Sequence, residues 1–144
     1  MPAIPAPLSR EVRRVRRTKI LVVEDEPNML EILREVLAAE EYDVVTAVDG
    51  REARAQVYKE TPDLILTDLQ LPGMDGLELL EKVRGDLSTR RIPVIFLTAV
   101  ESKDAEMQAY NLVADDYVTK PFQANLLLSR IRRSLFRAHL LEVG

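Results

Sequence analysis

The feature of this sequence that most limits its fold is a regular alternation of two kinds of segment. Short runs of β-branched and aliphatic residues recur along the chain, and each is four or five residues long: KILVV (19–23), DVVTA (43–47), DLILT (63–67), PVIFL (93–97) and DYVT (116–119). Several of these runs are almost entirely apolar, which is typical of parallel strands that are buried on both faces. They predict five buried strands.

Segments with helical periodicity lie between these runs. In residues 27–40 apolar side chains recur at helical spacing, and Pro27 suits the first turn of a helix. Asp75 and Glu78 have the spacing of a capping box, so another helix should start there. The remaining predicted helices are residues 50–60, 103–112 and 123–141. Five strand–helix units in strict alternation predict an α/β fold, an open parallel sheet with helices on both sides and right-handed crossovers.

Length and composition exclude several classes of protein. The 144 residues are enough for one domain with a single core. The sequence has no cysteine, which excludes disulfides, thiol catalysis and cysteine-ligated zinc. No apolar run approaches the length needed to cross a bilayer, and the N-terminus lacks the pattern of a secretory signal. We therefore expect a cytoplasmic protein.

Charge is unevenly distributed along the chain. Residues 1–19 contain six Lys or Arg and one acid, whereas the remainder contains 14 basic and 23 acidic residues. Three prolines fall within the first seven residues, so we expect residues 1–17 to be a flexible basic extension of a domain that spans residues 18–141. The acidic body argues against nucleic acid as its main ligand. We interpret the arginines of the last helix as a solvated face; they are Arg130, Arg132, Arg133 and Arg137.

Polar residues stand where the predicted strands end. Glu24 and Asp25 follow the first strand, Asp68 the third, Thr98 the fourth and Lys120 the fifth. Because the carboxyl ends of parallel strands lie at one edge of the sheet, these side chains should converge in one shallow cleft.

This set of side chains has a definite chemistry. Three carboxylates without His or Cys favour a hard cation such as Mg²⁺. Without metal the carboxylates repel one another, so at least one pKa should rise, and Lys120 should offset part of the repulsion. A carboxylate beside Mg²⁺ and an ammonium group can attack a phosphoryl group and form an aspartyl phosphate. Lys120 and the Thr98 hydroxyl would then stabilise the phosphoryl oxygens.

Each of these residues also has a structural interpretation. An acid at a strand end is usually a cap or loop residue, and acids before Pro27 could simply favour the dipole of the next helix. Thr98 could be a cap, Lys120 a surface charge and Tyr117 a packing residue. Their joint occurrence at the right strand ends favours the functional interpretation.

Together these segments resemble the receiver domain of bacterial two-component response regulators, of the kind that chemotaxis regulators represent. The matching segments are KILVVEDE (19–26), TDLQLPGMDG (67–76), PVIFLTA (93–99) and ADDYVTKPF (114–122). The resemblance implies a flavodoxin-like (βα)5 doubly wound parallel sheet with strand order 2-1-3-4-5. It also implies a cis Lys120–Pro121 peptide bond, which only an X–Pro bond adopts at low cost.

The resemblance also implies a role for each site residue. Asp68 would be the phosphoacceptor, Thr98 would bind a phosphoryl oxygen, Lys120 would form an ion pair and Tyr117 would be the aromatic switch. Mg²⁺ would be the cofactor, and Mn²⁺ could replace it. The metal ligands would be Glu24, Asp25, Asp68 and the backbone carbonyl of Gln70.

The implied function is that of a signalling phosphoacceptor, which catalyses only its own phosphorylation and dephosphorylation. A sensor histidine kinase or a phosphotransfer protein would donate the group. Phosphorylation would change the surface formed by residues 103–112, 116–119 and 123–141, through which, or through the last helix alone, a homodimer could form. An output domain or downstream protein outside this sequence would receive the signal, so we expect a stand-alone receiver or a piece of a longer regulator.

Two other functions stay open at this point. A pseudo-receiver would keep the fold and act only by docking to other proteins. A phosphatase of the haloacid dehalogenase type would need a second acid two residues after its nucleophile, where this sequence has Gln70. The sequence also departs from the receiver pattern at Glu24, Gln70 and Val113, which replace the more frequent Asp, Met and Gly, and none of these changes removes a catalytic element.

Overall fold

The computed structural model describes residues 17–99 and 115–143. Most of the expected N-terminal extension, the expected helix at residues 103–112 and Val113 lie outside the described residues. Among the helices described here, none is long and apolar enough to cross a bilayer.

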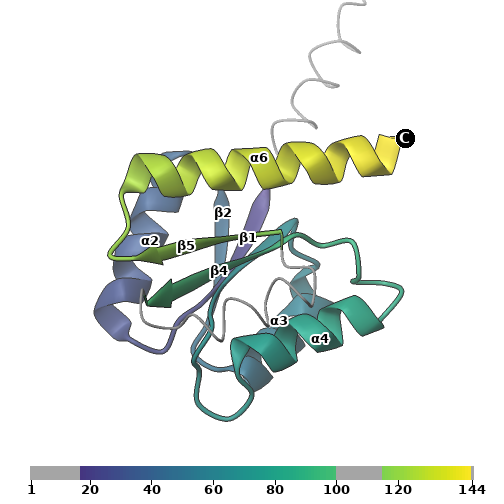
Figure 1. Ribbon diagram of the computed structural model, residues 1–144, viewed down its shortest axis with the longest axis horizontal. Coiled ribbons are helices and arrows are strands. Elements are labelled where there is room, and N and C mark those ends of the chain that lie inside the picture. Colours follow the sequence, from purple (N-terminus) through teal and green to yellow (C-terminus); the bar gives the residue numbers. More distant parts are fainter. Residues whose placement is uncertain (1–16, 100–114, 144) are drawn as a thin grey trace, which may run out of the picture.

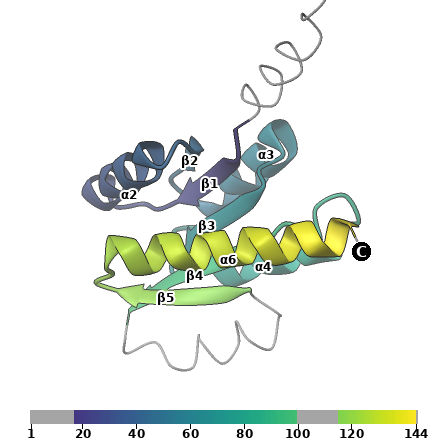
Figure 2. The same ribbon diagram turned by 90° about the horizontal axis from the view of Figure 1, so that it is seen from above.

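Five strands form one parallel sheet. They are β1 (Lys19–Val23), β2 (Asp43–Ala47), β3 (Leu64–Asp68), β4 (Val94–Ala99) and β5 (Asp116–Lys120). Their order is β2-β1-β3-β4-β5, and every neighbouring pair is parallel. Figure 2 shows β2 at one edge of the sheet and β5 at the other. The flavodoxin-like order is therefore confirmed.

The last three strands end later than predicted. The apolar runs suggested ends at residues 67, 97 and 119, whereas the ladders continue to Asp68, Ala99 and Lys120. Asp68 and Lys120 are thus the final residues of their strands, and Thr98 lies inside its strand. Backbone pairing holds these three residues in place.

Helices cover both faces of the sheet. They are α2 (Pro27–Ala39), α3 (Gly50–Glu60), α4 (Gly76–Gly85) and α6 (Ala124–Val143). In Figure 1, α6 lies above the sheet and α3 and α4 lie below it. Ile20 and Val22 of β1 belong to a core shared with α2 and α6, whereas Leu21 and Val23 belong to a core shared with α3 and α4. This alternation, which follows from the two-residue period of a strand, builds two cores from one sheet.

Glu26 starts helix α2. Its carboxylate accepts hydrogen bonds from the backbone N–H groups of Asn28 at 3.1 Å and Met29 at 2.7 Å, and Pro27 occupies the first turn as predicted. The structural interpretation of an acid before Pro27 is therefore correct for Glu26.

Asp-Gly pairs begin the two helices below the sheet. Asp49 accepts a hydrogen bond from the N–H of Glu52 at 2.8 Å, and Asp75 accepts one from the N–H of Glu78 at 2.9 Å. Both aspartates are N-caps, which confirms the predicted helix start at Asp75.

The glycines of these pairs allow the loop after β3 to pack tightly. A Cβ atom on Gly76 would lie 2.4 Å from the carbonyl oxygen of Asp68, and one on Gly50 would lie 2.0 Å from the carbonyl oxygen of Met74. A side chain at either position would therefore displace backbone. The loop that follows Asp68 is held between the starts of two helices.

Arginines from both helical layers hold the start of β5. Arg130 and Arg133 of α6 contact the buried Asp116 at 3.1 and 2.6 Å, and Arg84 of α4 contacts Asp115 at 2.8 Å. Two of the α6 arginines thus pair with β5 in addition to facing solvent: Arg133 is exposed, as predicted, and Arg130 is partly buried.

Replacing Gly76 by alanine should destabilise the fold. The new Cβ must displace the Asp68 carbonyl, so we expect Gly76→Ala to lower the free energy of unfolding by about 1–3 kcal/mol, the usual cost of overpacking. Gly85→Ala is the matched control, since a Cβ there meets no atom within 4 Å and alanine favours helix. Urea denaturation of the two variants measures the difference, and equal stabilities would contradict the packing argument.

Candidate functional site

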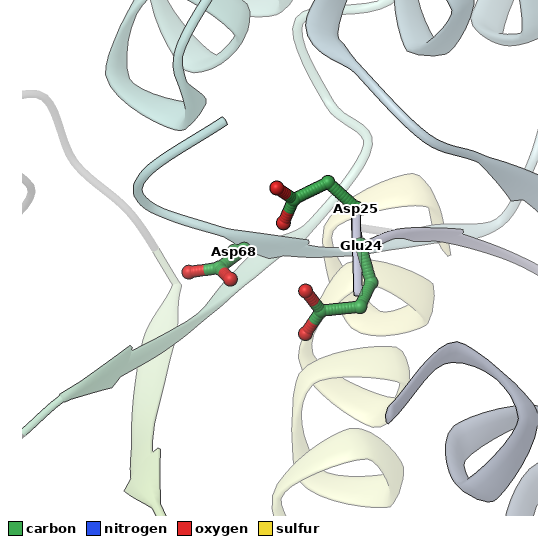
Figure 3. Close-up of side chains that lie close together, drawn as sticks. All are labelled: Glu24, Asp25 and Asp68. Atoms are coloured by element: carbon green, nitrogen blue, oxygen red, sulfur yellow. The ribbon is translucent and has the colours of Figure 1, made fainter. Parts of the chain in front are cut away.

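Three carboxylates converge at the carboxyl edge of the sheet. Glu24 and Asp25 directly follow β1, and Asp68 ends β3, the neighbouring strand. Figure 3 shows their carboxylate groups turned toward one another. One oxygen from each lies within 4.8 Å of the other two. The predicted convergence of these acids is confirmed.

Lys120 joins two of the acids. Its Nζ donates one hydrogen bond to Glu24 Oε1 and another to Asp68 Oδ2, each at 2.8 Å. The peptide bond from Lys120 to Pro121 is cis, as expected. Lys120 is therefore not the surface charge of the structural interpretation; it ties the end of β5 to the ends of β1 and β3.

The three acids differ in exposure. The side chain of Glu24 is 1% exposed and that of Asp68 is 15% exposed, whereas Asp25 is open to solvent. Glu24 Oε2 also accepts a hydrogen bond from the N–H of Glu26 at 3.3 Å. Glu24 thus forms the floor of the group, and the other two acids face outward.

Burial and charge change the proton affinities of this group. Burial, with a further contribution from the negative charge of Asp68, raises the pKa of Glu24 although the hydrogen bond from Lys120 opposes the change. Burial alone would lower the pKa of Lys120, but its hydrogen bonds to Asp68 and Glu24 and their charges outweigh burial and raise it. One carboxyl pKa is raised, as expected, but burial rather than repulsion among the acids is its largest cause, and Lys120 stays protonated at neutral pH.

A cleft of about 520 Å³ opens above the acids. It brings together five of the residues predicted from the sequence: Asp25, Asp68, Gln70, Thr98 and Lys120. The rest of its lining was missed, because these apolar residues carry no chemistry of their own: Leu69, Leu71, Pro72 and Ala99. Their sequence signal is their position at a strand end: Leu69, Leu71 and Pro72 follow β3, and Ala99 is the last residue of β4.

Two further polar groups line the cleft: the backbone of Gln70, next to Asp68, and the hydroxyl of Thr98, in the neighbouring strand β4. The N–H of Gln70 points to Asp68 Oδ1 at 3.4 Å, so the Gln70 backbone lies next to this carboxylate. Thr98 is buried, and its hydroxyl donates to the carbonyl of Ala99 at 3.3 Å. In the sheet register Asp68 pairs with Leu97, one residue before Thr98.

Tyr117 is not among the described residues that line the cleft. It pairs with Phe96 in the register of β4 and β5, two residues before Thr98, so Tyr117 and Thr98 share one face of the sheet. The ring is half-buried and packs against the core below the sheet. The sheet register thus places Tyr117 and Thr98 on the same face of neighbouring strands.

The donor set fits a hard divalent cation. All three side chains offer carboxylate oxygens, one is exposed, and the cleft leaves room for water, which Mg²⁺ retains when it binds to proteins. The same edge presents an ammonium group and a hydroxyl. This combination of groups suits the binding of a phosphoryl group to the carboxylate of Asp68.

Solved structures share this fold. The chain is 36% identical to the signal receiver domain of a signal transduction histidine kinase from Syntrophus aciditrophicus, with a TM-score of 0.77, over 82% of this chain and 89% of that one. It is 30% identical to the chemotaxis response regulator CheY4 of Vibrio cholerae, with a TM-score of 0.77, over 83% and 99% of the two chains.

A third similar structure contains a metal ion. It is the receiver domain of the sensor histidine kinase PA1611 from Pseudomonas aeruginosa, described with a magnesium ion coordinated in its active-site cleft. It is 29% identical to this chain, with a TM-score of 0.77, over 83% of this chain and 98% of that one.

The sequence also matches a protein family over most of its length. Residues 20–132 match the family described as the response regulator receiver domain, and this range contains every site residue discussed above. The chain therefore belongs to the response regulator receiver domain family.

Proposed function

We propose that this chain is a phosphorylation-controlled receiver in which Asp68 accepts a phosphoryl group from a histidine kinase or a phosphotransfer protein. The observation that carries the proposal is the position of Lys120, whose Nζ lies 2.8 Å from both Glu24 and Asp68. An ammonium group at this place offsets the negative charge that would otherwise keep a phosphoryl group away from the acids.

In the proposed Mg-dependent transfer, the carboxylate of Asp68 is the nucleophile and a phosphohistidine is the donor. An oxygen of Asp68 attacks phosphorus and forms a new O–P bond while the P–N bond to the donor histidine breaks. The electron pair of that bond stays on the imidazole nitrogen, which takes up a proton. Asp68 suits this role because its side chain is 15% exposed and lines the cleft, whereas the side chain of Glu24 is 1% exposed.

The proposed metal ligands are Glu24, Asp25, Asp68 and the backbone carbonyl of Gln70. Mg²⁺ or Mn²⁺ bound there would supply positive charge next to the phosphoryl oxygens. Among the ligands, Asp25 is exposed to solvent, and Gln70 adjoins Asp68 through its N–H. Lys120 holds Glu24 and Asp68 in place through its two contacts at 2.8 Å.

The proposed response involves Thr98 and Tyr117. The Thr98 hydroxyl can turn from the Ala99 carbonyl to a phosphoryl oxygen on Asp68, because its present hydrogen bond is long at 3.3 Å. Tyr117 lies on the same sheet face and would take up the space that Thr98 leaves. The change would then reach the surface of β5 and α6 and favour an active state.

We also propose that residues 18–141 form the receiver and residues 1–17 a basic extension. The family match over residues 20–132 lies within the proposed receiver and supports this division.

Replacing Asp68 tests the phosphoacceptor directly. Incubation with acetyl phosphate and Mg²⁺ should add one phosphoryl group to the wild type, seen by intact-protein mass spectrometry, and Asp68→Asn should stay unmodified. Asp49→Asn is the matched control, since asparagine also caps a helix and Asp49 caps α3 outside the cleft. An unmodified wild type at saturating donor would favour the pseudo-receiver.

Metal binding gives an independent test. Mg²⁺ should bind at one saturable site in a calorimetric titration, and Asp25→Asn should weaken this binding about tenfold or more, which is about 1.4 kcal/mol. Asp49→Asn should bind Mg²⁺ like the wild type. A wild type without a saturable site would argue against the proposed ligands.

Replacing Lys120 should shift the titration of Glu24. Because the hydrogen bond from Lys120 opposes the effect of burial, Lys120→Met should raise the pKa of Glu24 above its wild-type value. A raised pKa favours the protonated carboxyl in the folded state, so the variant should lose stability as the pH rises through that pKa.

Carbon-13 NMR of the Glu24 carboxyl measures its pKa in both proteins. An unchanged pKa in Lys120→Met would mean that Lys120 does not hold this carboxylate in solution.

A further inference from the structure

A second concave surface lies on the outer side of α3 and α4. Two clefts of about 470 and 590 Å³ adjoin there and share Arg54 and Tyr58. We call the combined surface the α3–α4 groove. Helix α3 lines it with Arg51, Arg54, Ala55 and Tyr58, and Met74 and residues 81, 82 and 85–87 complete it. Figure 1 shows the two helices below the sheet, on the face opposite α6. The groove is separate from the carboxylate cleft.

Apolar side chains are unusually exposed in this groove. Tyr58 is 46% exposed and Leu87 is 79% exposed. Ala55 is also exposed and lies one helical turn before Tyr58 on α3. Exposed apolar side chains that gather in a concave surface are typical of a binding site, whereas scattered ones need no explanation.

The ring of Tyr58 is held in position. Its hydroxyl donates to Asp86 Oδ2 at 2.5 Å, and Asp86 Oδ1 accepts from the N–H of Ser88 at 2.9 Å. The hydrogen bond from Tyr58 lowers the pKa of Asp86, so this carboxylate stays ionised and bound. A ring fixed in this way loses little freedom when another group packs on it, which favours binding.

The charges in the groove are arranged asymmetrically. The cleft that contains Ala55 is lined by Arg51 and Arg54 and by no acid. The second cleft adds Lys82 and two acids, Glu81 and Asp86, of which Asp86 accepts the hydrogen bond from Tyr58. The positive charge is therefore concentrated in the cleft beside Ala55 and Tyr58, which matches a ligand that carries both an apolar side chain and carboxylates.

We propose that the α3–α4 groove docks a segment of a partner protein that presents leucine-like side chains between acidic residues. The basic N-terminal extension does not fit this site, because its net charge has the same sign as that of Arg51 and Arg54. Such a partner would also contact Met74, which lines the groove and belongs to the loop that follows Asp68. The docking itself does not depend on phosphorylation of Asp68.

The test uses the full chain, labelled with nitrogen-15, and the peptide acetyl-Glu-Leu-Leu-Glu-amide. We expect saturable shifts of the backbone amides of residues 51–58 and 82–87 in the NMR spectrum. Two matched peptides separate the contributions: one has Gln in place of Glu, and the other has Ser in place of Leu. Each should bind about tenfold more weakly, because it loses either the charge or the apolar contact.

Substitutions locate the site. Arg54→Glu should weaken binding of the acidic peptide about tenfold, since an attraction becomes a repulsion. Arg132→Glu, an exposed arginine of α6 on the opposite face, should bind like the wild type. Leu87→Ala gives a second variant that does not threaten the fold, because this side chain is 79% exposed, and it too should weaken binding.

Three outcomes would overturn the proposal. The first is the absence of saturable shifts at the groove, and the second is equal binding of the acidic peptide in which Ser replaces Leu. The third is a shift of the same amides when the protein alone is diluted, which would identify a second copy of this chain as the occupant.

Discussion

The ammonium group of Lys120 stands between two carboxylates, and the geometry of the site depends on this contact. Glu24 is almost fully buried, and a buried charge is stable only when a partner of opposite charge and hydrogen bonds compensate it. The partner comes from 96 residues further along the chain, and Asp68 from a third strand. Only a sheet that places β1 and β3 side by side, with β5 beyond β4, lets these three strand ends meet. The contact of Lys120 with Glu24 and Asp68 therefore depends on the strand order, and it lies at the carboxyl edge of the sheet.

The loop after Asp68 connects this edge to the rest of the molecule. It runs from Asp68 to Asp75, lines the cleft, and is held where Gly50 and Gly76 leave no room for a Cβ atom. Met74 of the same loop also lines the α3–α4 groove. The loop from Asp68 to Asp75 therefore has little room to rearrange when the charge of Asp68 changes. Because close-packed backbone transmits strain, such a change should shift the loop as a unit. The carboxylate cleft and the α3–α4 groove are therefore both lined by this loop.

The sequence predicts the fold and the site well where a pattern repeats along the chain. It predicts less well the ends of strands and the ion pairs, which depend on single residues. Apolar runs define the strands, and polar residues at their ends define the cleft, because all parallel strands end at one edge. The polar residues Asp68 and Lys120 suggested that the ladders had already stopped, whereas backbone pairing ignores side-chain polarity and continues through them. Nor could spacing show that Arg130 and Arg133 reach Asp116, since this depends on the rotation of α6 relative to β5.

The three consecutive acids after β1 show why local context sets function. Glu26 caps α2, Asp25 faces solvent, and Glu24 turns inward to Lys120, although all three carry the same charge in the sequence. In the proposed reaction a phosphoryl group on Asp68 adds negative charge that attracts Lys120, which weakens the compensation of Glu24. A cation held by Asp25 and its neighbours would restore the balance. Metal binding and phosphorylation at this site should therefore favour each other: the phosphoryl group adds negative charge that attracts the cation, and the cation compensates this charge and that of Glu24.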